Sequence, residues 1–235
     1  MRFMLSLGAL LSGLVASVAA AATAPEIQAI RDNAFRADTQ MLMYVALDKA
    51  RERRMAVDKA MATVEKGLAS INDPALVNRW QLTRTALSTS PYHDTGEVNQ
   101  LILYRWENET MAFLAELDSH MPRDLSRQKK ELYELVTRMQ LMTLIYLRNQ
   151  TDPLGGNNYI GVNNVELSDL SSAFTKRLNE VMKTNPALKA KLHPVSAKWA
   201  FLSKHVASRT SNVPFIVDRY GHQIVDMLLV IANAG

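Results

Sequence analysis

Apolar residues recur at helical spacing along most of this chain, and no segment alternates them in the two-residue period of a half-buried β-strand. The stretch from Glu26 to Ser70 contains no proline and a single glycine, Gly67, so it predicts one long helix whose polar middle, residues 48–54, is solvated. Its inward face consists of Ile27, Ile30, Ala34, Ala37, Met41 and Tyr44, and resumes at Met61, Val64, Leu68 and Ile71. This period predicts an all-α protein, an elongated bundle of the four-helix type.

Proline and short polar residues mark where the other helices start and stop. Asp73 followed by Pro74 predicts a helix start, with Asp73 as the N-cap and Pro74 at the first helical position. The helix after that one is expected to end near Pro122. In the second half the predicted caps are Asp124 or Ser126, then Ser168 and Asn212, and a further helix is predicted to begin at Pro194.

Three short matches relate the first half of the chain to the second half, in the same order. They pair Thr39-Gln40-Met41 with Thr137-Arg138-Met139, Asp73-Pro74-Ala75-Leu76 with Asn185-Pro186-Ala187-Leu188, and Trp80 with Trp199. We therefore predict two tandem pseudo-repeats, residues 23–122 and 123–235, that pack as one bundle. Chance similarity between amphipathic helices is the alternative.

The N-terminal segment has the three parts of a secretory signal peptide. Arg2 supplies a positive start, residues 3–18 form an apolar run, and the small residues 19–24 close it. We predict a signal peptide at residues 1–22 and a periplasmic mature protein. The run is shorter than the roughly 20 residues of a spanning helix, although an uncleaved membrane anchor remains an alternative. No later segment offers an uninterrupted apolar span, so no membrane span is expected in the mature chain.

Composition excludes several kinds of chemistry. The chain has no cysteine, which excludes disulfides, thiolate metal sites, iron–sulfur clusters and a cysteine nucleophile. Its net charge of +4 is far below the surplus typical of a nucleic-acid-binding protein, so nucleic acid is not an expected partner. Charge is nevertheless uneven, with a surplus of seven positive charges in residues 173–210 and of five negative charges in residues 91–120. Solvated helix faces, contact between the two faces within one molecule or in a homodimer, and an anionic partner are the possible uses.

The second half carries the motifs of a known sensor family. Arg138-Met139-Gln140-Leu141-Met142 is followed by the pattern Leu170-x-x-x-Phe174-x-x-x-Leu178 and then by Trp199. This order resembles the PilJ-type sensor family, the exported helical input modules of type IV pilus chemotaxis transducers, which are related to the nitrate-sensing modules of NarX-type kinases. The resemblance implies a four-helix-type bundle that binds a small ligand or a partner and does no chemistry.

The chain departs from this family in two respects. The first half has Asp38-Thr39-Gln40-Met41 where the family pattern favours an arginine beside the methionine. The chain also ends at Gly235 without a second membrane span or a transmitter. It therefore resembles a free-standing member of the family, expected to deliver its bound state to a separate receptor.

Arg138 is the residue predicted to contact a ligand, because an arginine beside a buried helical seam can hold a small oxyanion by two parallel hydrogen bonds. Gln140 in the same motif, and Arg36 and Gln40 on the first helix, are its predicted companions. The alternative is an exposed Arg138 that pairs with Glu134 one helical turn away. The four residues predict a binding site for a small anion or metabolite.

The histidines and carboxylates of the chain are not arranged as catalytic or metal-binding groups are. The five histidines lie on different predicted elements and no G-x-S-x-G motif is present, so we predict no enzymatic activity and no cofactor. Glu116 with His120 and His222 with Asp226 are isolated i, i+4 pairs, which favour surface pairing over metal ligation.

Two other functions remain open beside the favoured one, an exported, non-enzymatic, sensor-like module. An adaptor or scaffold of an envelope assembly, such as a pilus or a chemoreceptor, would use the charged faces as contacts. A b-type haem bundle would use Met41 or Met43 with His222 as axial ligands. The asparagine-rich loop at residues 157–164 either links two helices or forms the lip of a binding site.

Overall fold

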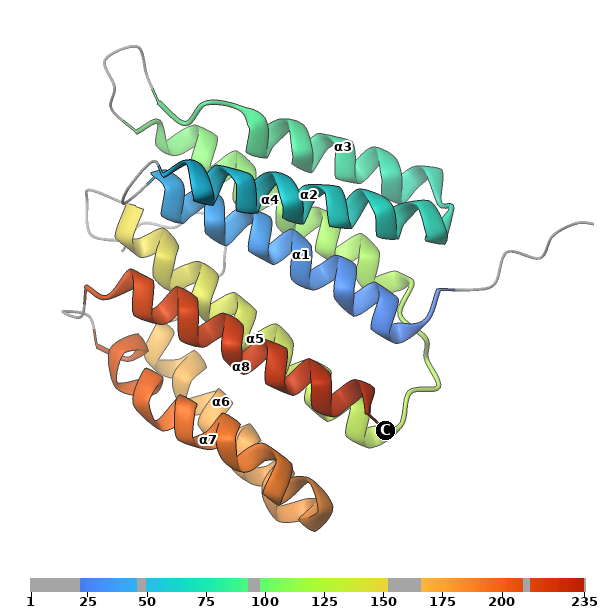
Figure 1. Cartoon of the computed structure of the whole chain (residues 1–235), viewed down its shortest axis with the longest axis vertical. Helices are drawn as coiled ribbons and strands as arrows, with labels where there is room; N and C mark the ends of the chain where they lie inside the picture. Colours follow the sequence, from blue (N-terminus) through green and yellow to red (C-terminus); the bar gives the residue numbers. More distant parts are fainter. Residues whose placement is uncertain (1–21, 46–49, 93–97, 152–165, 209–211, 235) are drawn as a thin grey trace, which may run out of the picture.

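The computed structural model describes residues 22–45, 50–92, 98–151, 166–208 and 212–234 (Figure 1). Within them the chain forms eight α-helices and no β-strand, apart from one isolated β-bridge between Tyr92 and Val98. The helices are α1 (Ala24–Met43), α2 (Arg51–Ile71), α3 (Pro74–Ser88), α4 (Gln100–Ser119), α5 (Arg127–Thr151), α6 (Leu167–Thr184), α7 (Pro186–Val206) and α8 (Pro214–Asn233). The predicted all-α bundle is confirmed. The predicted signal peptide, apart from Ala22, and the predicted loop at 157–164 lie outside the described residues.

The helices stack as pairs, α3 with α4, α1 with α2, α5 with α8, and α6 with α7 (Figure 1). Contacts between α1 and α5 join the two halves of the chain, with α8 touching α1 beside them. One hydrophobic core runs through all eight helices, and its largest fully buried side chains include Trp80, Trp106 and Tyr146. Among the described residues, none of the helices combines the length and the apolar character that crossing a bilayer requires.

The single long helix predicted from Glu26 to Ser70 is wrong. α1 ends at Met43, and α2 begins at Arg51 after an extended residue, Ala50. The two helices lie side by side, and both of their apolar faces are buried in the same core (Figure 1). A straight helix would leave one of these faces without a partner, so burial breaks the helix where no proline or glycine does.

Two predicted helix caps are confirmed. Asp73 precedes Pro74, and its Oδ1 accepts hydrogen bonds from the backbone N–H groups of Ala75 at 2.8 Å and Leu76 at 3.4 Å. Ser126 precedes α5, and its hydroxyl oxygen accepts the backbone N–H of Lys129 at 3.3 Å. In both cases a side-chain oxygen satisfies an N–H group that has no partner within its own helix.

Three other predicted boundaries are wrong. α6 begins at Leu167, so Ser168 lies inside its first turn, and α8 begins at Pro214 after Val213, one residue later than an Asn212 cap requires. α7 begins at Pro186 and continues through Pro194. Proline removes one backbone donor, but the buried neighbours Leu192 and Val195 keep this turn packed.

Glycines lie in the two helix pairs with the most extensive contacts, α1 with α2 and α5 with α8. A β-carbon on Gly67 of α2 would overlap Ile30 of α1, whose Cδ1 would be 2.9 Å away and whose Cγ1 would be nearer still. A β-carbon on Gly221 of α8 would overlap the hydroxyl of Thr143 of α5, with two carbons of that threonine at 3.3 Å. The absence of a side chain at each glycine therefore sets how closely the two backbones approach.

The three matched segments of the predicted repeat fall on helices in the same order in each half, but the helices of the two halves pack differently. The first and second matches fall on α1 and α5 and at the starts of α3 and α7. Trp80 of α3 stacks on Phe113 of α4 at 5.0 Å between ring centroids, whereas Trp199 of α7 stacks on Phe174 of α6 at 4.6 Å. The main partner of α1 is α2, whereas that of α5 is α8. The repeat boundaries at residues 122 and 123 remain a prediction.

Candidate functional site

Three of the four predicted ligand residues meet in one polar seam between α1, α5 and α8, and Arg36 lies at its centre. Its Nε donates to Asp32 Oδ2 at 2.7 Å, and its Nη2 donates to Asp226 Oδ1 of α8 at 2.5 Å. Burial disfavours the charged form of Arg36, but the charge and hydrogen bond of Asp32, followed by the charges of Asp226 and Asp218, raise its pKa overall. Arg36 is therefore held as a cation that ties α1 to α8.

Gln140 of α5 reaches the same carboxylate from the other side. Its side chain is buried, and its Nε2 donates to Asp32 Oδ1 at 3.0 Å. Asp32 thus accepts from Arg36 on its own helix and from Gln140 on the first helix of the second half. These bonds give Gln140 a structural partner and place it at the junction of the two halves.

Gln40 lies one turn beyond Arg36 on α1 and links α8 to α2. Its Nε2 donates to Asp218 of α8, at 3.0 Å from Oδ1 and 3.1 Å from Oδ2. Its Oε1 accepts from Arg53 Nη1 of α2 at 3.1 Å. The Arg53 guanidinium also lies 3.9 Å from Asp218 Oδ2 and 5.0 Å from the centroid of the Phe215 ring. Gln40 therefore positions the Asp218 carboxylate and the Arg53 guanidinium at the same time.

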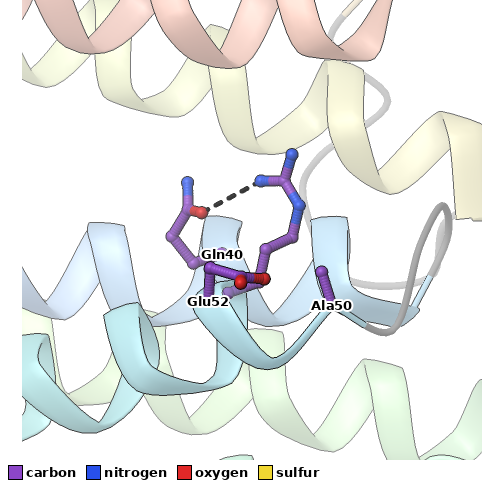
Figure 2. Close-up of a pocket in the computed structure, with 4 residues that line it drawn as sticks. Gln40, Ala50 and Glu52 are labelled. Carbon is purple, nitrogen blue, oxygen red and sulfur yellow. Dashed lines mark hydrogen bonds between the residues drawn. The ribbon is translucent and has the colours of Figure 1, made fainter.

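A pocket of about 320 Å³ opens at the start of α2. It is lined by Gln40 of α1 and by Ala50, Glu52 and Arg53 of α2. Figure 2 shows Gln40 beside Ala50 and Glu52, with the hydrogen bond from Arg53 to Gln40 drawn as a dashed line. The polar seam thus ends at an open surface that a small molecule can reach.

The first turn of α2 is unusual in charge. It contains Arg51, Arg53 and Arg54 against a single acid, Glu52, although the positive end of a helix dipole disfavours cations. Its N-cap residue is Ala50, which has no side-chain acceptor for the first N–H groups. An anion near this turn would be stabilised by the helix dipole and by the arginines together, against the repulsion of Glu52.

Arg138 does not join this seam. It donates to Glu134 Oε1 from Nε at 3.0 Å and from Nη2 at 2.8 Å, and Glu134 also accepts from Arg177 of α6. Arg138 and Gln140 are two residues apart, which is about 200° around a helix, so they point to different neighbours. The ion pair with Glu134 is the arrangement that the sequence offered as the alternative to ligand binding.

His222 of α8, the predicted partner of Met41 or Met43 in a haem site, lies in the seam and contacts other groups. Its Nε2 is 3.2 Å from Thr39 Oγ1 and 3.2 Å from Asp218 Oδ1. The predicted pair of His222 with Asp226 is not formed, because Asp226 instead accepts from Arg36. Met41 and Met43 are buried on α1.

The other predicted pair, Glu116 with His120, is also divided between different partners. His120 Nε2 lies 3.1 Å from Asp73 Oδ2, at the start of α3, and Glu116 Oε2 lies 3.7 Å from Arg79 Nε. Within the part of the chain that the structure describes, no three histidine or acidic side chains gather closely enough to hold a metal ion. His93 lies outside that part.

Sequence reasoning missed Arg53 and Asp218, the two charged partners of Gln40. Arg53 belongs to the polar stretch that was predicted to be solvated, and only the turn back into α2 brings it to Gln40. Asp218 lies one helical turn before His222 on α8, a spacing that could have drawn attention to it.

No protein-family model matches the chain, and no similar protein was found among curated proteins or solved structures. The contacts of the seam and the pocket are therefore the basis on which a function can be assigned.

Proposed function

We propose that the protein is an exported, non-enzymatic, sensor-like module that binds a small anion or anionic metabolite in the pocket at the start of α2. The observation that carries the proposal is that Gln40, a predicted ligand residue, lines this pocket together with the cation Arg53. The signal-peptide-like segment supports export, and the resemblance to PilJ-type modules supports sensing and delivery of the bound state to a receptor.

Asp218 is the group that an anion would replace opposite Arg53. The 3.9 Å between Arg53 Nη1 and Asp218 Oδ2 is longer than a direct hydrogen bond, whereas Gln40 holds both Asp218 oxygens at about 3 Å. A planar oxyanion or carboxylate can bind a guanidinium through two parallel hydrogen bonds. Nitrate, nitrite and small carboxylates are therefore the ligands of choice.

Ligand binding should raise the melting temperature. A ligand at 100 times its Kd stabilises the folded protein by about 2.7 kcal/mol, which for a chain of this size is a rise in Tm of roughly 5–10 °C. We expect at least one of nitrate, nitrite or a small carboxylate to give such a rise when measured against chloride at equal ionic strength. Arg53→Gln, which removes the charge from the pocket, should abolish it.

Arg84→Gln is the matched control, because Arg84 is half-exposed on α3 and pairs with Glu65 away from the pocket. It should leave the ligand-induced rise unchanged. Arg138→Gln distinguishes the two predicted sites: loss of the rise in this variant, with Arg53→Gln unaffected, would place the ligand at Arg138 and overturn the pocket proposal. A Tm that no anion of the panel changes would remove anion binding altogether.

A second candidate function, an adaptor in an envelope assembly, is favoured by the uneven surface charge. The exposed lysines of α6 and α7 form no ion pair with any described residue; they are Lys176, Lys183, Lys189, Lys191 and Lys204. Three acids of α4 are instead paired with arginines of the first half, Glu109 and Glu116 with Arg79 and Asp118 with Arg31. Among the described residues no ion pair joins the two charged faces, which leaves the lysines of α6 and α7 for an anionic partner.

Charge reversal on α6 tests the adaptor. Lys176→Glu with Lys183→Glu should lose a protein that the wild type recovers from envelope extract, because the partner must be acidic. Lys59→Glu with Lys66→Glu is the matched control, since these exposed lysines have the same spacing on α2. Equal recovery by both double variants would count against a partner at this face.

A further inference from the structure

Three charged side chains lie inside the core where α1, α4 and α5 meet. The exposed fraction is 1% for Asp38 of α1, 7% for Glu107 of α4 and 3% for Arg148 of α5. Arg148 Nε lies 3.8 Å from Glu107 Oε2, and the guanidinium lies 4.9 Å from the centroid of the Tyr104 ring. Because α1 and α4 belong to the first half and α5 to the second, this cluster lies at the junction of the halves.

The cluster contains two carboxyl groups and one guanidinium, so full ionisation would bury one uncompensated negative charge. Such a charge is far more costly in the core than a neutral carboxyl group. Glu107 has Arg148 as its partner. Asp38 Oδ2 is buried and accepts no hydrogen bond from the described residues. Asp38 is therefore the group that a proton would neutralise.

The charged groups around α1 leave this balance unchanged. Glu107 and the hydroxyl of Thr110, both on α4, and Arg148 on α5 are the groups that act on Asp38. The other charged groups that α2, α4 and α8 turn toward α1 have partners of their own, namely Arg53 with Gln40, Arg54 with Asp58, Asp118 with Arg31, His222 with Thr39 and Asp218, and Asp226 with Arg36.

We propose that Asp38, Glu107 and Arg148 form a buried proton-binding site at the junction of the two halves, which takes up one proton when the halves pack together. The proton resides on Asp38, and Glu107 remains ionised beside Arg148. The packing of α1 and α4 against α5 is thereby linked to pH.

The pKa values of Asp38 and Glu107 are both shifted in the direction that this charge balance requires. The pKa of Asp38 is raised to about 7, first because burial disfavours its charged form and then because Glu107 repels it, while Arg148 and Thr110 act in the opposite direction. Burial also raises the pKa of Glu107, and Arg148 opposes that shift. Both acids therefore hold protons more tightly in the folded protein than in the unfolded chain.

The direction of the pH dependence follows from these values. The ordinary pKa of the Asp38 carboxyl is 3.8, so between about pH 4 and pH 7 the folded protein binds a proton that the unfolded chain does not. Stability is therefore greatest at the acid end of this window and falls as the pH rises through it. For one proton, the folding equilibrium constant falls about tenfold per pH unit.

Urea unfolding of the full chain at pH 5 and pH 7 measures this effect, with Asp38→Asn as the test variant. The asparagine imitates the protonated acid, so the fall of about 50-fold in the folding constant that the wild type owes to Asp38 should be absent from the variant. All other ionisable side chains are the same in both proteins, so the difference between the two isolates Asp38. Asp58→Asn, at an exposed position of α2 that pairs with Arg54, should keep the wild-type dependence.

Carboxyl-detected NMR of the wild type supplies a second measurement that does not depend on how the variant folds. A midpoint near pH 7 for Asp38 would support the site, and a midpoint near 4 would overturn it. An Asp38→Asn variant with the same pH dependence as the wild type would overturn it as well.

Discussion

Replacing Arg148 by methionine is expected to lower the free energy of unfolding by about 3–5 kcal/mol at pH 8, because it leaves buried carboxylates without their cation. The side chain of Arg148 is almost fully buried, and its aliphatic part can be replaced by that of methionine with little change of volume. At pH 5 the loss should be smaller, because Asp38 and Glu107 can then both take up protons. Urea unfolding at the two pH values measures both effects.

The matched control for this prediction is Arg84→Met. Arg84 pairs with Glu65 at 3.2 Å on the surface, with about half of its side chain exposed. Exposed ion pairs contribute about 1 kcal/mol or less, so this variant should stay close to the wild type at both pH values. A loss for Arg148→Met that equals that of Arg84→Met would show that the buried arginine is not needed to balance the acids.

Trp199→Ala should lower the free energy of unfolding by about 3–5 kcal/mol, since it removes a large ring from the core of the second half. Trp199 packs against Phe174, and its Nε1 donates to Thr175 Oγ1 at 2.9 Å. The remaining tryptophans, Trp80 and Trp106, are both fully buried in the first half. Their fluorescence therefore reports on the half that the substitution does not touch.

If the two halves form one packed bundle, the fluorescence transition and the far-UV circular dichroism transition of this variant should shift to lower denaturant by the same amount. Phe201→Ala on the same helix is the control, because Phe201 is 43% exposed and its loss should shift neither transition by much. A fluorescence midpoint that stays at the wild-type value while circular dichroism shows an earlier step would mean that the halves unfold separately.

The sequence predicted the fold class well, because the residues that a helical bundle buries recur at helical spacing, and this spacing can be recognised in the sequence. Leu132, Leu135, Met139 and Met142, for example, form the buried face of α5. The break between α1 and α2 could not be predicted in the same way. No proline, glycine or cap residue marks it, and its cause is the pairing of two apolar faces that are distant in sequence.

The candidate site was predicted in part. Arg36 and Gln40 are one turn apart, so their common face follows from helix geometry, and the structure places both in the seam. Arg138 and Gln140 were chosen from a shared motif, and a separation of two residues sends them to different neighbours. Whether an arginine at a helix surface meets a ligand or a glutamate depends on tertiary neighbours that periodicity does not reveal.

The buried acids had a sequence signal that went unused. Asp38 lies four residues after Ala34 and three before Met41, both on the predicted apolar face of the first helix. An acid at such a position must be buried or must distort the helix, and its partner must come from another helix. The charged groups that act on Asp38, Glu107 and Arg148, come from helices distant in the sequence, and finding them required the structure.

The close contacts at Gly67 and Gly221 divide four of the helices into two pairs. At Gly67 and at Gly221 a helix backbone lies directly against a side chain of the neighbouring helix, so α1 with α2, and α5 with α8, each pack as a close pair. Arg53 of α2 and Asp218 of α8 join these two helix pairs, with 3.9 Å between Nη1 and Oδ2. A molecule bound beside Arg53 in the pocket would therefore lie where the two helix pairs meet.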